Sequence, residues 1–408
     1  MRETISSSVA VIGGGPAGLA AALALAQSDL DTVLIDPATD PAADKRTAAL
    51  MAASVTMLQR LGVWSNCRDG AAPLRVIRIM DDTGRLLRAP TVEFAASELG
   101  EEAFGWNIPN ADLVEALRAA CRISERITLC AARVDSVETA EDGARIALSD
   151  GRTVACQLVV GADGRNSPSR RAAGIAADEW SYDQAAIVTS FAHSRPHGFA
   201  STEYHRPSGP FTLVPLPGQR SSLVWVEAAR KAEAIGTFPK ADLAREIERL
   251  SHRLLGRVSE IGPVGVIPLA GLTARRFARN RVALVGEAGH VMPPIGAQGL
   301  NLGLRDAATI AELAGAAAER GEDVGGGGVM EAYDRARRLD VMSRIGAVDL
   351  LNRSLLSGFL PLQAARAAGL VALANAGPLR RFLLREGIAP RIALPRLMKR
   401  DEAWSDGR

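Results

Sequence analysis

The sequence predicts an α/β protein in which a parallel sheet carries an inserted antiparallel sheet and is followed by a C-terminal helical segment. A short apolar run at residues 9–12 enters a glycine-rich turn that opens an alanine-rich helix. Residues 31–36 form a second buried-strand pattern that ends in an acid. From residue 185 to 270 the pattern changes to alternating runs, which are typical of antiparallel strands. The 408 residues suffice for two packed domains and an appendage.

The turn at residues 13–18 has the strand-turn-helix context of a dinucleotide-binding fingerprint. Gly13 permits the tight turn, Gly15 lets the backbone approach a pyrophosphate, and Gly18 lets the helix lie close to the sheet. Asp36 stands where a carboxylate accepts hydrogen bonds from a ribose. Together these features predict a Rossmann-like dinucleotide-binding domain.

The composition is that of an ordinary soluble globular protein. Hydrophobic residues make up 47% and charged residues 23%, and a formal net charge of +2 gives no strong field to recruit nucleic acid. The four cysteines lie far apart, which argues against a disulfide framework or a zinc site and favours the cytoplasm. No secretory signal precedes the first strand. The most membrane-like stretch, residues 355–377, is interrupted by polar residues and proline, so no spanning helix is expected.

Periodicity places the other elements. A helix is expected just after Arg46, ending near Gly62, and a strand over 74–80 whose hairpin joins the inserted sheet. Asn110 is expected to cap a helix over 111–121. Further expected elements are strands at 127–137, 144–148 and 153–160, helices at 241–255, from 300 or 301 to 318 and at 333–351, and a flexible glycine linker at 325–328.

Two further stretches place a glycine-flanked acid after a buried strand. In residues 159–171 the strand ends at Gly161-Ala162-Asp163-Gly164 and enters a basic helix start, a pattern that also suits a simple capped turn. In residues 281–290 a strand ends at Gly286-Glu287, and a glycine-rich loop then leads into a long helix. A helix N-terminus presented in this way can hold negative charge.

These stretches, in this order, resemble the FAD-dependent aromatic hydroxylases of the para-hydroxybenzoate hydroxylase class. The likeness is strongest to the ubiquinone-biosynthesis hydroxylases and covers most of the chain. It is carried by Arg46-Thr47-Ala48-Ala49-Leu50, Gly161-Ala162-Asp163-Gly164-Arg165 and Gln298-Gly299-Leu300-Asn301-Leu302-Gly303-Leu304-Arg305-Asp306-Ala307. The resemblance implies FAD as cofactor and NADH or NADPH as reductant.

The resemblance also implies roles for single residues. The three fingerprint glycines would hold the FAD pyrophosphate, Asp36 the adenosine ribose, and Arg46 another part of the cofactor. Asp163 would serve both FAD and NAD(P)H, and Gly286-Glu287 the ribityl chain and pyrophosphate. The loop 296–301 would present backbone N–H groups to the flavin pyrimidine edge. The expected cofactor-binding residues are Gly13, Gly15, Pro16, Ala17, Gly18, Asp36, Arg46, Asp163, Gly164, Gly286, Glu287, Gly296, Gln298, Gly299, Leu300 and Asn301.

The expected division of the chain rests on the change of pattern near residue 185 and on this resemblance. An FAD-binding domain comprises residues 1–73, 105–180 and 271–345. A substrate domain comprises 74–104 and 181–270, and a C-terminal helical region comprises 346–408. In the substrate domain Tyr204, His205, Phe211 and Trp225 are candidate substrate contacts, although aromatic residues in strands are more often core.

The implied activity is hydroxylation of the aromatic ring of a polyprenylated phenol in ubiquinone biosynthesis, through a flavin hydroperoxide formed with O2. No metal or protein nucleophile is needed, and His290 is a candidate for acid/base chemistry beside a packing role. An isoprenoid reductase or halogenase of the same fold and a non-catalytic FAD-bearing subunit remain alternatives. Glu287, where the family usually has Asp, is the one feature that hints at the last of these.

The expected partners are a lipophilic phenol and O2, without nucleic acid. Membership of a biosynthetic complex, or a homo-oligomer, is a further expectation. The expected location is the cytoplasm, where apolar residues between 351 and 362 would rest on the inner face of the membrane.

Overall fold

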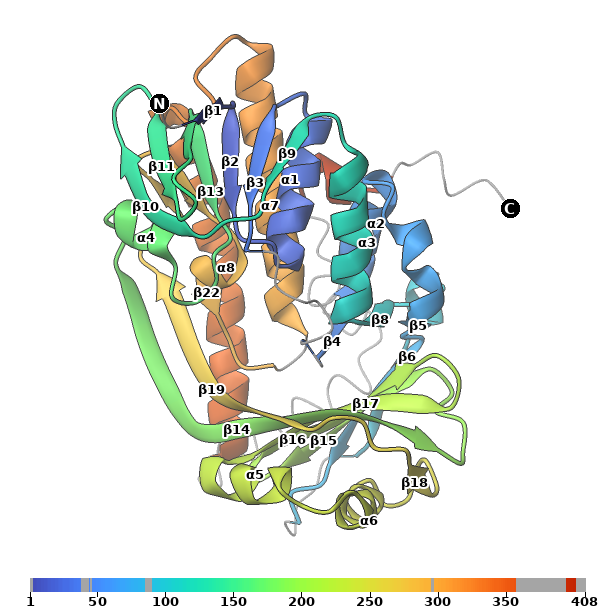
Figure 1. The fold of residues 1–408 in the computed structure, drawn as a ribbon. Coiled ribbons are helices and arrows are strands. Elements are labelled where there is room, and N and C mark those ends of the chain that lie inside the picture. The colour runs from blue at the N-terminus through green and yellow to red at the C-terminus, as the bar shows by residue number, and fades with distance from the viewer. Residues whose placement is uncertain are drawn as a thin grey trace.

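The computed structural model describes residues 3–37, 44, 46–84, 90–294, 297–356 and 394–400, with side chains of the last long helix described up to residue 346. Figure 1 shows two layers of structure: a parallel sheet with its helices in the upper part, and a broad antiparallel sheet below it. The α/β fold with an inserted antiparallel sheet is therefore confirmed.

The parallel sheet lies between a layer of helices and a small four-stranded sheet. In β2, Val9 and Val11 pack with the helices, whereas Ala10 and Ile12 pack with the small sheet. This alternation buries both faces, as expected for a parallel sheet. The sheet order is β20 (Ala278–Arg279), β21 (Val282–Leu284), β13 (Leu158–Gly161), β2 (Val9–Ile12), β3 (Thr32–Ile35) and β9 (Ile127–Cys130), and the small sheet is β1 (Thr4–Ser6), β12 (Thr153–Cys156), β11 (Ala144–Leu148) and β10 (Val134–Thr139).

Three helices pack together on the face of the parallel sheet that is opposite the small four-stranded sheet. Helix α1 is rich in alanine, and its residues 18–26 are all buried because small side chains let it lie close to both the sheet and its neighbours. The helices of this layer are α1 (Pro16–Gln27), α3 (Asn110–Ile123) and α7 (Gln298–Glu319), with α8 (Gly327–Leu356) beside α7. The short helix α4 (Pro168–Ala172) follows β13 and packs against β10 of the small sheet.

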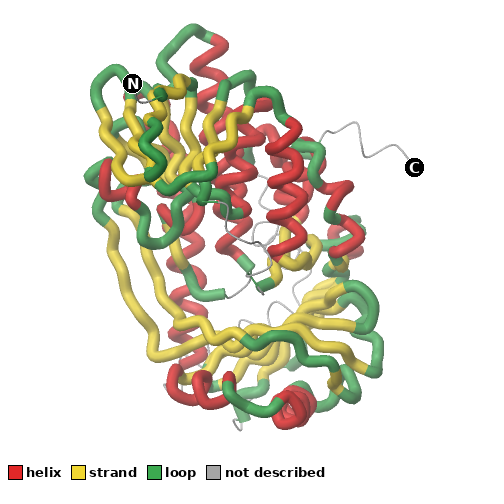
Figure 2. Tube along the Cα trace, in the orientation of Figure 1, coloured by secondary structure: helices red, strands yellow, loops and turns green. Residues whose placement is uncertain are grey.

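The second large sheet is antiparallel except at one junction. Strand β14 is 17 residues long, and with β19 it connects the two layers, as Figure 2 shows. The expected hairpin does join this sheet, because β6 pairs with β15 in parallel register. The strands are β22 (His290–Val291), β19 (Gly265–Ala274), β14 (Ala177–His193), β17 (Arg220–Ala228), β16 (Gly209–Leu216), β15 (Ala200–Arg206), β6 (Val76–Asp81) and β7 (Val92–Ala95), with β18 (Val258–Ser259) beside β14 and helices α5 (Ala229–Gly236) and α6 (Lys240–Leu250) on the outer face.

The segment after Arg46 corrects the sequence prediction. Residues Thr47–Met51 form strand β4, and only Ala52–Arg60 are helical, as α2. Strand β4 pairs with β8 (Gly105–Pro109), which also pairs with β5 (Ala72–Pro73). Tertiary pairing thus overrides the helix propensity of the alanine-rich sequence.

Other details also differ from the prediction, among them the strand expected at 127–137, which is divided between β9 and β10 of different sheets. Residues 153–160 form two strands, because the chain changes sheet between β12 and β13. The predicted helix over 241–255 ends at Leu250, followed by left-handed residues at 252 and 253. Asn110 is the first residue of α3 and makes no cap hydrogen bond, donating instead to Asp44. The glycine run at 325–328 is not wholly a linker, because α8 begins at Gly327. A Cβ on Gly325 would lie 1.9 Å from the Gln157 carbonyl oxygen, so glycine permits a close contact there.

Two remaining expectations concern cysteines and membranes. The four cysteines are free and buried, and burial raises the pKa of Cys121 and Cys156 to about 12. Within the described ranges, no helix is both long and apolar enough to cross a membrane. The proposed bilayer contacts between 351 and 362 lie outside the described side chains.

Candidate functional site

The turn after β2 depends on close backbone packing. Gly13 has φ +114°, and a Cβ there would lie 2.2 Å from the Ala162 carbonyl oxygen. A Cβ on Gly18 would lie 2.0 Å from the Gly13 oxygen, so the first turn of α1 sits directly on this loop. Both glycines are required because the ends of β2 and β13 and the start of α1 meet here.

The N-terminus of α1 opens onto free space. Gly15 is its N-cap residue and forms no side-chain cap hydrogen bond, and nothing lies within 4 Å of where its Cβ would be. Pro16 follows as the first helical residue. The first backbone N–H groups of a helix lack intrahelical partners and carry the positive end of the dipole. This terminus can therefore receive an anionic group.

Asp36 lies at the side of the same turn. A Cβ on Gly14 would lie 2.2 Å from the Asp36 carboxylate. One carboxylate oxygen, Oδ2, accepts a 3.0 Å hydrogen bond from Arg118 of α3, and both side chains are mostly buried. The carboxylate is thus held in place next to the glycine turn, at the carboxyl end of β3.

Asp163 lies after β13, beside the same opening. Its Oδ2 accepts hydrogen bonds from the backbone N–H and the hydroxyl of Ser169, at 2.8 and 2.7 Å. Its Oδ1 is buried and has no hydrogen-bond partner within the described residues. Gly164 follows with φ +76°. A buried carboxylate oxygen that lacks a donor is costly, so a ligand hydroxyl fits this position.

The Gly286-Glu287 turn is held by a fully buried carboxylate. Gly286 has φ +63°, and its N–H donates to Asp306 Oδ2 at 2.9 Å. His290 Nε2 lies 2.7 Å from the same oxygen, and Arg337 donates to Oδ1 at 2.6 Å. Burial raises the pKa of Asp306, but Arg337 and His290 outweigh it and hold that pKa below its usual value. The structure thus places His290 in a buried hydrogen-bonded cluster with Asp306, at the side of this turn.

This buried group extends into a network between α7 and α8. Asp340 accepts from Arg305, Arg337 and Arg344, each at 2.8 to 2.9 Å, and these cations hold its pKa well below its usual range despite burial. Arg344 also donates to Gln298 Oε1 at 2.9 Å. Sequence reasoning singled out Gln298 and quoted Arg305 and Asp306 within a motif, but it did not connect them with Arg337, Asp340 and Arg344. The members are spread over some 50 residues, and those on α8 resemble ordinary helix-surface charges.

Arg46 and Glu287, distant in sequence, are brought together. Arg46 forms a bidentate pair with Asp44, and its guanidinium lies 3.9 Å from Glu287 Oε1. Both side chains are half exposed or more. The Glu287 side chain, one methylene longer than that of aspartate, therefore extends toward Arg46 at the exposed side of the turn.

The loop before α7 ends in a residue with left-handed geometry, Ala297, at φ +53°, and α7 has no side-chain cap. The side chain of Asn301 is fully engaged: Oδ1 accepts from Met51 N and Ser54 Oγ, and Nδ2 donates to the carbonyls of Ala49 and Ala297. Asn301 thus fastens β4 and α2 to α7. Gly299 and Leu300 lie in the first turn, while Gly296 lies outside the described residues.

Comparison with known proteins identifies the family. The model of the FAD binding domain family matches residues 6–345. The chain belongs to this family. Ubiquinone hydroxylase UbiL of Rhodospirillum rubrum is 35% identical over 93% of this chain and 89% of its own length. The 3-demethoxyubiquinol 3-hydroxylase of Escherichia coli is 30% identical over 92% of this chain and 97% of its own.

Solved structures show the same fold. The p-nitrophenol 4-monooxygenase PnpA of Pseudomonas putida superposes with a TM-score of 0.77, at 20% identity, over 95% of this chain and 98% of its own. PieE, a flavin-dependent monooxygenase solved with FAD and substrate, gives 0.69 at 21% identity, over 96% of this chain and 73% of its own. Our chain is an FAD-dependent monooxygenase.

The residues of this monooxygenase fit FAD. The uncapped α1 terminus with open space before Gly15 suits a pyrophosphate. The partnerless Asp163 Oδ1 suits a hydroxyl of the ribityl chain. A Cβ on Gly286 would lie 3.4 Å from the Ala17 side chain. The start of α1 and the Gly286-Glu287 turn are therefore in contact, and together they form one surface for the cofactor to bind.

The four candidate substrate contacts lie on opposite faces of the antiparallel sheet. Tyr204, Phe211 and Trp225 lie in the core between the sheet and α5 and α6, and the Tyr204 hydroxyl donates to the Ser251 carbonyl. They are therefore removed from the candidates, since they face away from the FAD-binding layer. His205 lies on the opposite face of its strand from Tyr204.

Proposed function

We propose that this monooxygenase hydroxylates the aromatic ring of a polyprenylated phenol in ubiquinone biosynthesis, with NADH or NADPH as reductant. The observation that carries the proposal is the near full-length similarity to ubiquinone hydroxylases, at 35% and 30% identity. Bound FAD supplies the activation of O2.

The chain's own residues bind and orient the reactants. The α1 N-terminus would hold the pyrophosphate, Asp36 the adenosine ribose, and Asp163 Oδ1 a ribityl hydroxyl. The first turn of α7, around Gly299, would present backbone N–H groups and the positive end of its dipole to the pyrimidine edge of the flavin. Asn301 holds that turn against β4, so the position of the flavin edge depends on it.

The inner face of the antiparallel sheet suits an apolar phenol. Ser222 Oγ accepts hydrogen bonds from Thr47 and Asn107, which marks this face as the one toward the FAD-binding layer. Strand alternation and cross-strand pairing place Val214 and Val224 on the same face. His205 lies on this face as well, and its position there keeps it a candidate substrate contact. Its Nε2 lies 2.8 Å from Glu203 Oε1.

The test is oxygen incorporation. Purified protein carrying FAD is given NADH or NADPH, ¹⁸O2 and a panel of prenylated phenols, and products are analysed by mass spectrometry. Ring-hydroxylated product carrying one labelled oxygen supports the proposal. Saturation of the prenyl chain without label would identify a reductase, and ring halogenation in the presence of halide a halogenase. Bound flavin that neither nucleotide reduces would identify a non-catalytic subunit.

A further inference from the structure

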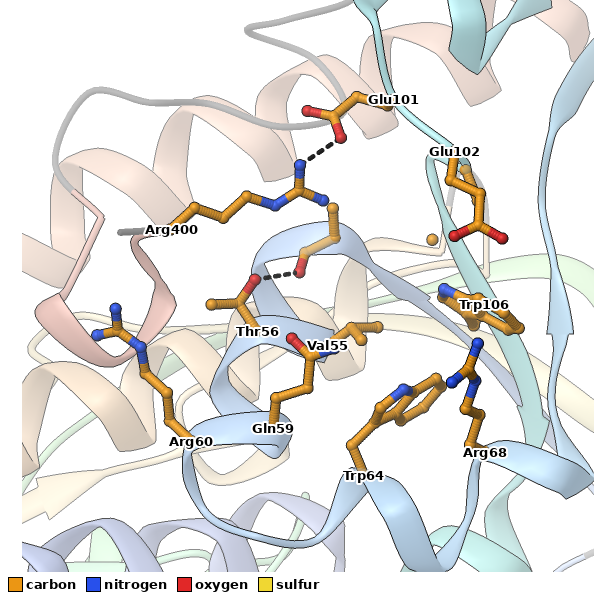
Figure 3. A pocket seen from close by; sticks show the side chains of 13 residues that line it. Val55, Thr56, Gln59, Arg60, Trp64, Arg68, Glu101, Glu102, Trp106 and Arg400 are labelled. Atoms are coloured by element: carbon orange, nitrogen blue, oxygen red, sulfur yellow. Dashed lines mark hydrogen bonds and ion pairs between the residues drawn. The ribbon is translucent and has the colours of Figure 1, made fainter. Parts of the chain in front are cut away.

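A cleft of about 710 Å³ lies outside the FAD-binding turns. It is formed by α2, by the short helical turns η2 (Trp64–Asn66) and η3 (Arg68–Gly70), by β8 with the residues before it, and by Arg400 near the C-terminus. Its volume is within the range of about 300–1,000 Å³ usual for small-molecule sites. Figure 3 shows the labelled side chains converging on it from these elements.

The cleft is separate from the substrate face of the molecule. Strand β8 lies between them, and its side chains alternate in direction. Trp106 lines the cleft, whereas Asn107 points the other way and donates to the Pro215 carbonyl and Ser222 Oγ of the antiparallel sheet. A ligand in this cleft therefore occupies a second site and not an extension of the first.

One part of the wall is apolar and aromatic. The Trp64 and Trp106 rings meet edge to face, with centroids 5.5 Å apart, and Val55 and two alanines complete the surface. Rigid aromatic surface of this kind favours an apolar chain or ring over a small hydrated ion.

The charges at the rim favour an anionic head group. Glu101 is paired with Arg400, and Glu102 lies 3.6 Å from Arg75. Arg68 places its guanidinium carbon 5.7 Å from the centre of the Trp106 ring and forms no ion pair within the described part of the chain. In Figure 3 this guanidinium stands beside Trp106 at the edge of the cleft. It is the available donor for a carboxylate, to which guanidinium binds in bidentate geometry.

We propose that this cleft is a second ligand site, which binds an amphiphile carrying a carboxylate. The apolar body lies against Trp64, Trp106 and Val55, and the carboxylate pairs with Arg68. The ion pair between Arg400 and Glu101 closes the opposite side, so the C-terminal residues contribute to the wall.

Titration with three twelve-carbon probes tests the proposal. Dodecanoate, dodecanol and dodecyltrimethylammonium are added, below their micellar concentrations, to the full-length holoprotein, with tryptophan fluorescence and calorimetry as readouts. We expect saturable binding of one dodecanoate per chain, at least ten-fold tighter than dodecanol, with the cation weakest. Equal affinity for all three probes, or no saturable dodecanoate binding, would overturn the proposal.

Variants locate the site. Arg68→Gln is expected to raise the Kd for dodecanoate at least ten-fold and leave that for dodecanol unchanged, and Arg68→Lys to give an intermediate value. Arg122→Gln, an exposed arginine of α3 that does not line the cleft, is the matched control and should bind as the wild type does. Thermal unfolding verifies that each variant is folded. Dodecanoate affinity that is the same in Arg68→Gln and wild type would refute the assignment.

Discussion

Two glycine turns lie side by side at the proposed FAD site, and they keep their shape by different means. The turn of Gly13 is fixed by backbone atoms, since Ala162 and the first turn of α1 leave no room for a side chain. The turn of Gly286 is fixed by side chains, through the buried Asp306 and its partners His290 and Arg337. A turn of the first kind fails when an atom is added, and one of the second kind fails when a charge is removed.

The largest effect is expected from Asp306→Asn. This change keeps the shape of the side chain but removes one of the two carboxylates that pair with the buried Arg337 guanidinium and leaves it only Asp340. The expected cost is about 3 kcal/mol of unfolding free energy, the lower end of the range for breaking a buried ion pair. Asp242→Asn, which breaks an exposed pair within α6, is the control and should cost less than about 1 kcal/mol. Denaturant unfolding measures both. If the two variants were equally stable, the side-chain account of the second turn would be wrong.

The same contrast explains what the sequence could reveal. The glycine spacing at 13–18 predicts its turn because each glycine answers a local steric demand that is visible in a few adjacent residues. Asp306 gives no such signal: it lies in the middle of a helix, and its partners Gly286, His290 and Arg337 come from three other elements. The two-layer fold was predicted because the hydrophobic period changes from one layer to the other. Strand β4 was not, because its pairing with β8 depends on residues some 60 positions away.

The second prediction compares the stability effects of substituting two glycines in the turn of Gly13. In Gly13→Ala the methyl group meets the Ala162 carbonyl at positive φ, so overpacking and backbone strain together should cost about 2–4 kcal/mol. In Gly15→Ala φ is −74° and the surrounding space is open, so stability should change by less than about 0.5 kcal/mol.

Cofactor affinity should show the reverse pattern in Gly15→Ala. The added methyl group occupies the space proposed for the pyrophosphate, so the Kd for FAD should rise although the apoprotein is as stable as wild type. Flavin fluorescence on reconstitution measures the Kd, and thermal unfolding of apoprotein measures the stability. Normal FAD affinity in Gly15→Ala would mean that the pyrophosphate lies elsewhere.

The third prediction uses acid to weaken the buried carboxylate cluster that holds the turn of Gly286. The pKa values of Asp306 and Asp340 are below the ordinary 3.8, so each carboxylate stabilises the fold above that pH and loses this contribution as pH falls through the folded-state pKa. Each contributes a slope of up to about 1.4 kcal/mol per pH unit below the unfolded pKa. Unfolding free energy measured from pH 5 to 3 should therefore fall more steeply in wild type than in Asp306→Asn, and identical slopes would contradict this.

The smallest effect is expected from Glu287→Asp, which introduces the residue that the family resemblance leads us to expect at this position. The pair between Glu287 and Arg46 is long, at 3.9 Å, and exposed, so its loss should change stability by less than about 0.5 kcal/mol. Arg46 keeps its bidentate partner Asp44, which holds it in place without Glu287. We therefore expect FAD affinity and the rate of flavin reduction by NADH or NADPH to change less than three-fold. A much larger gain in the reduction rate would show that Glu287 restrains the reaction and that the turn of Gly286, unlike that of Gly13, is tuned by its exposed side chain as well as by its buried ones.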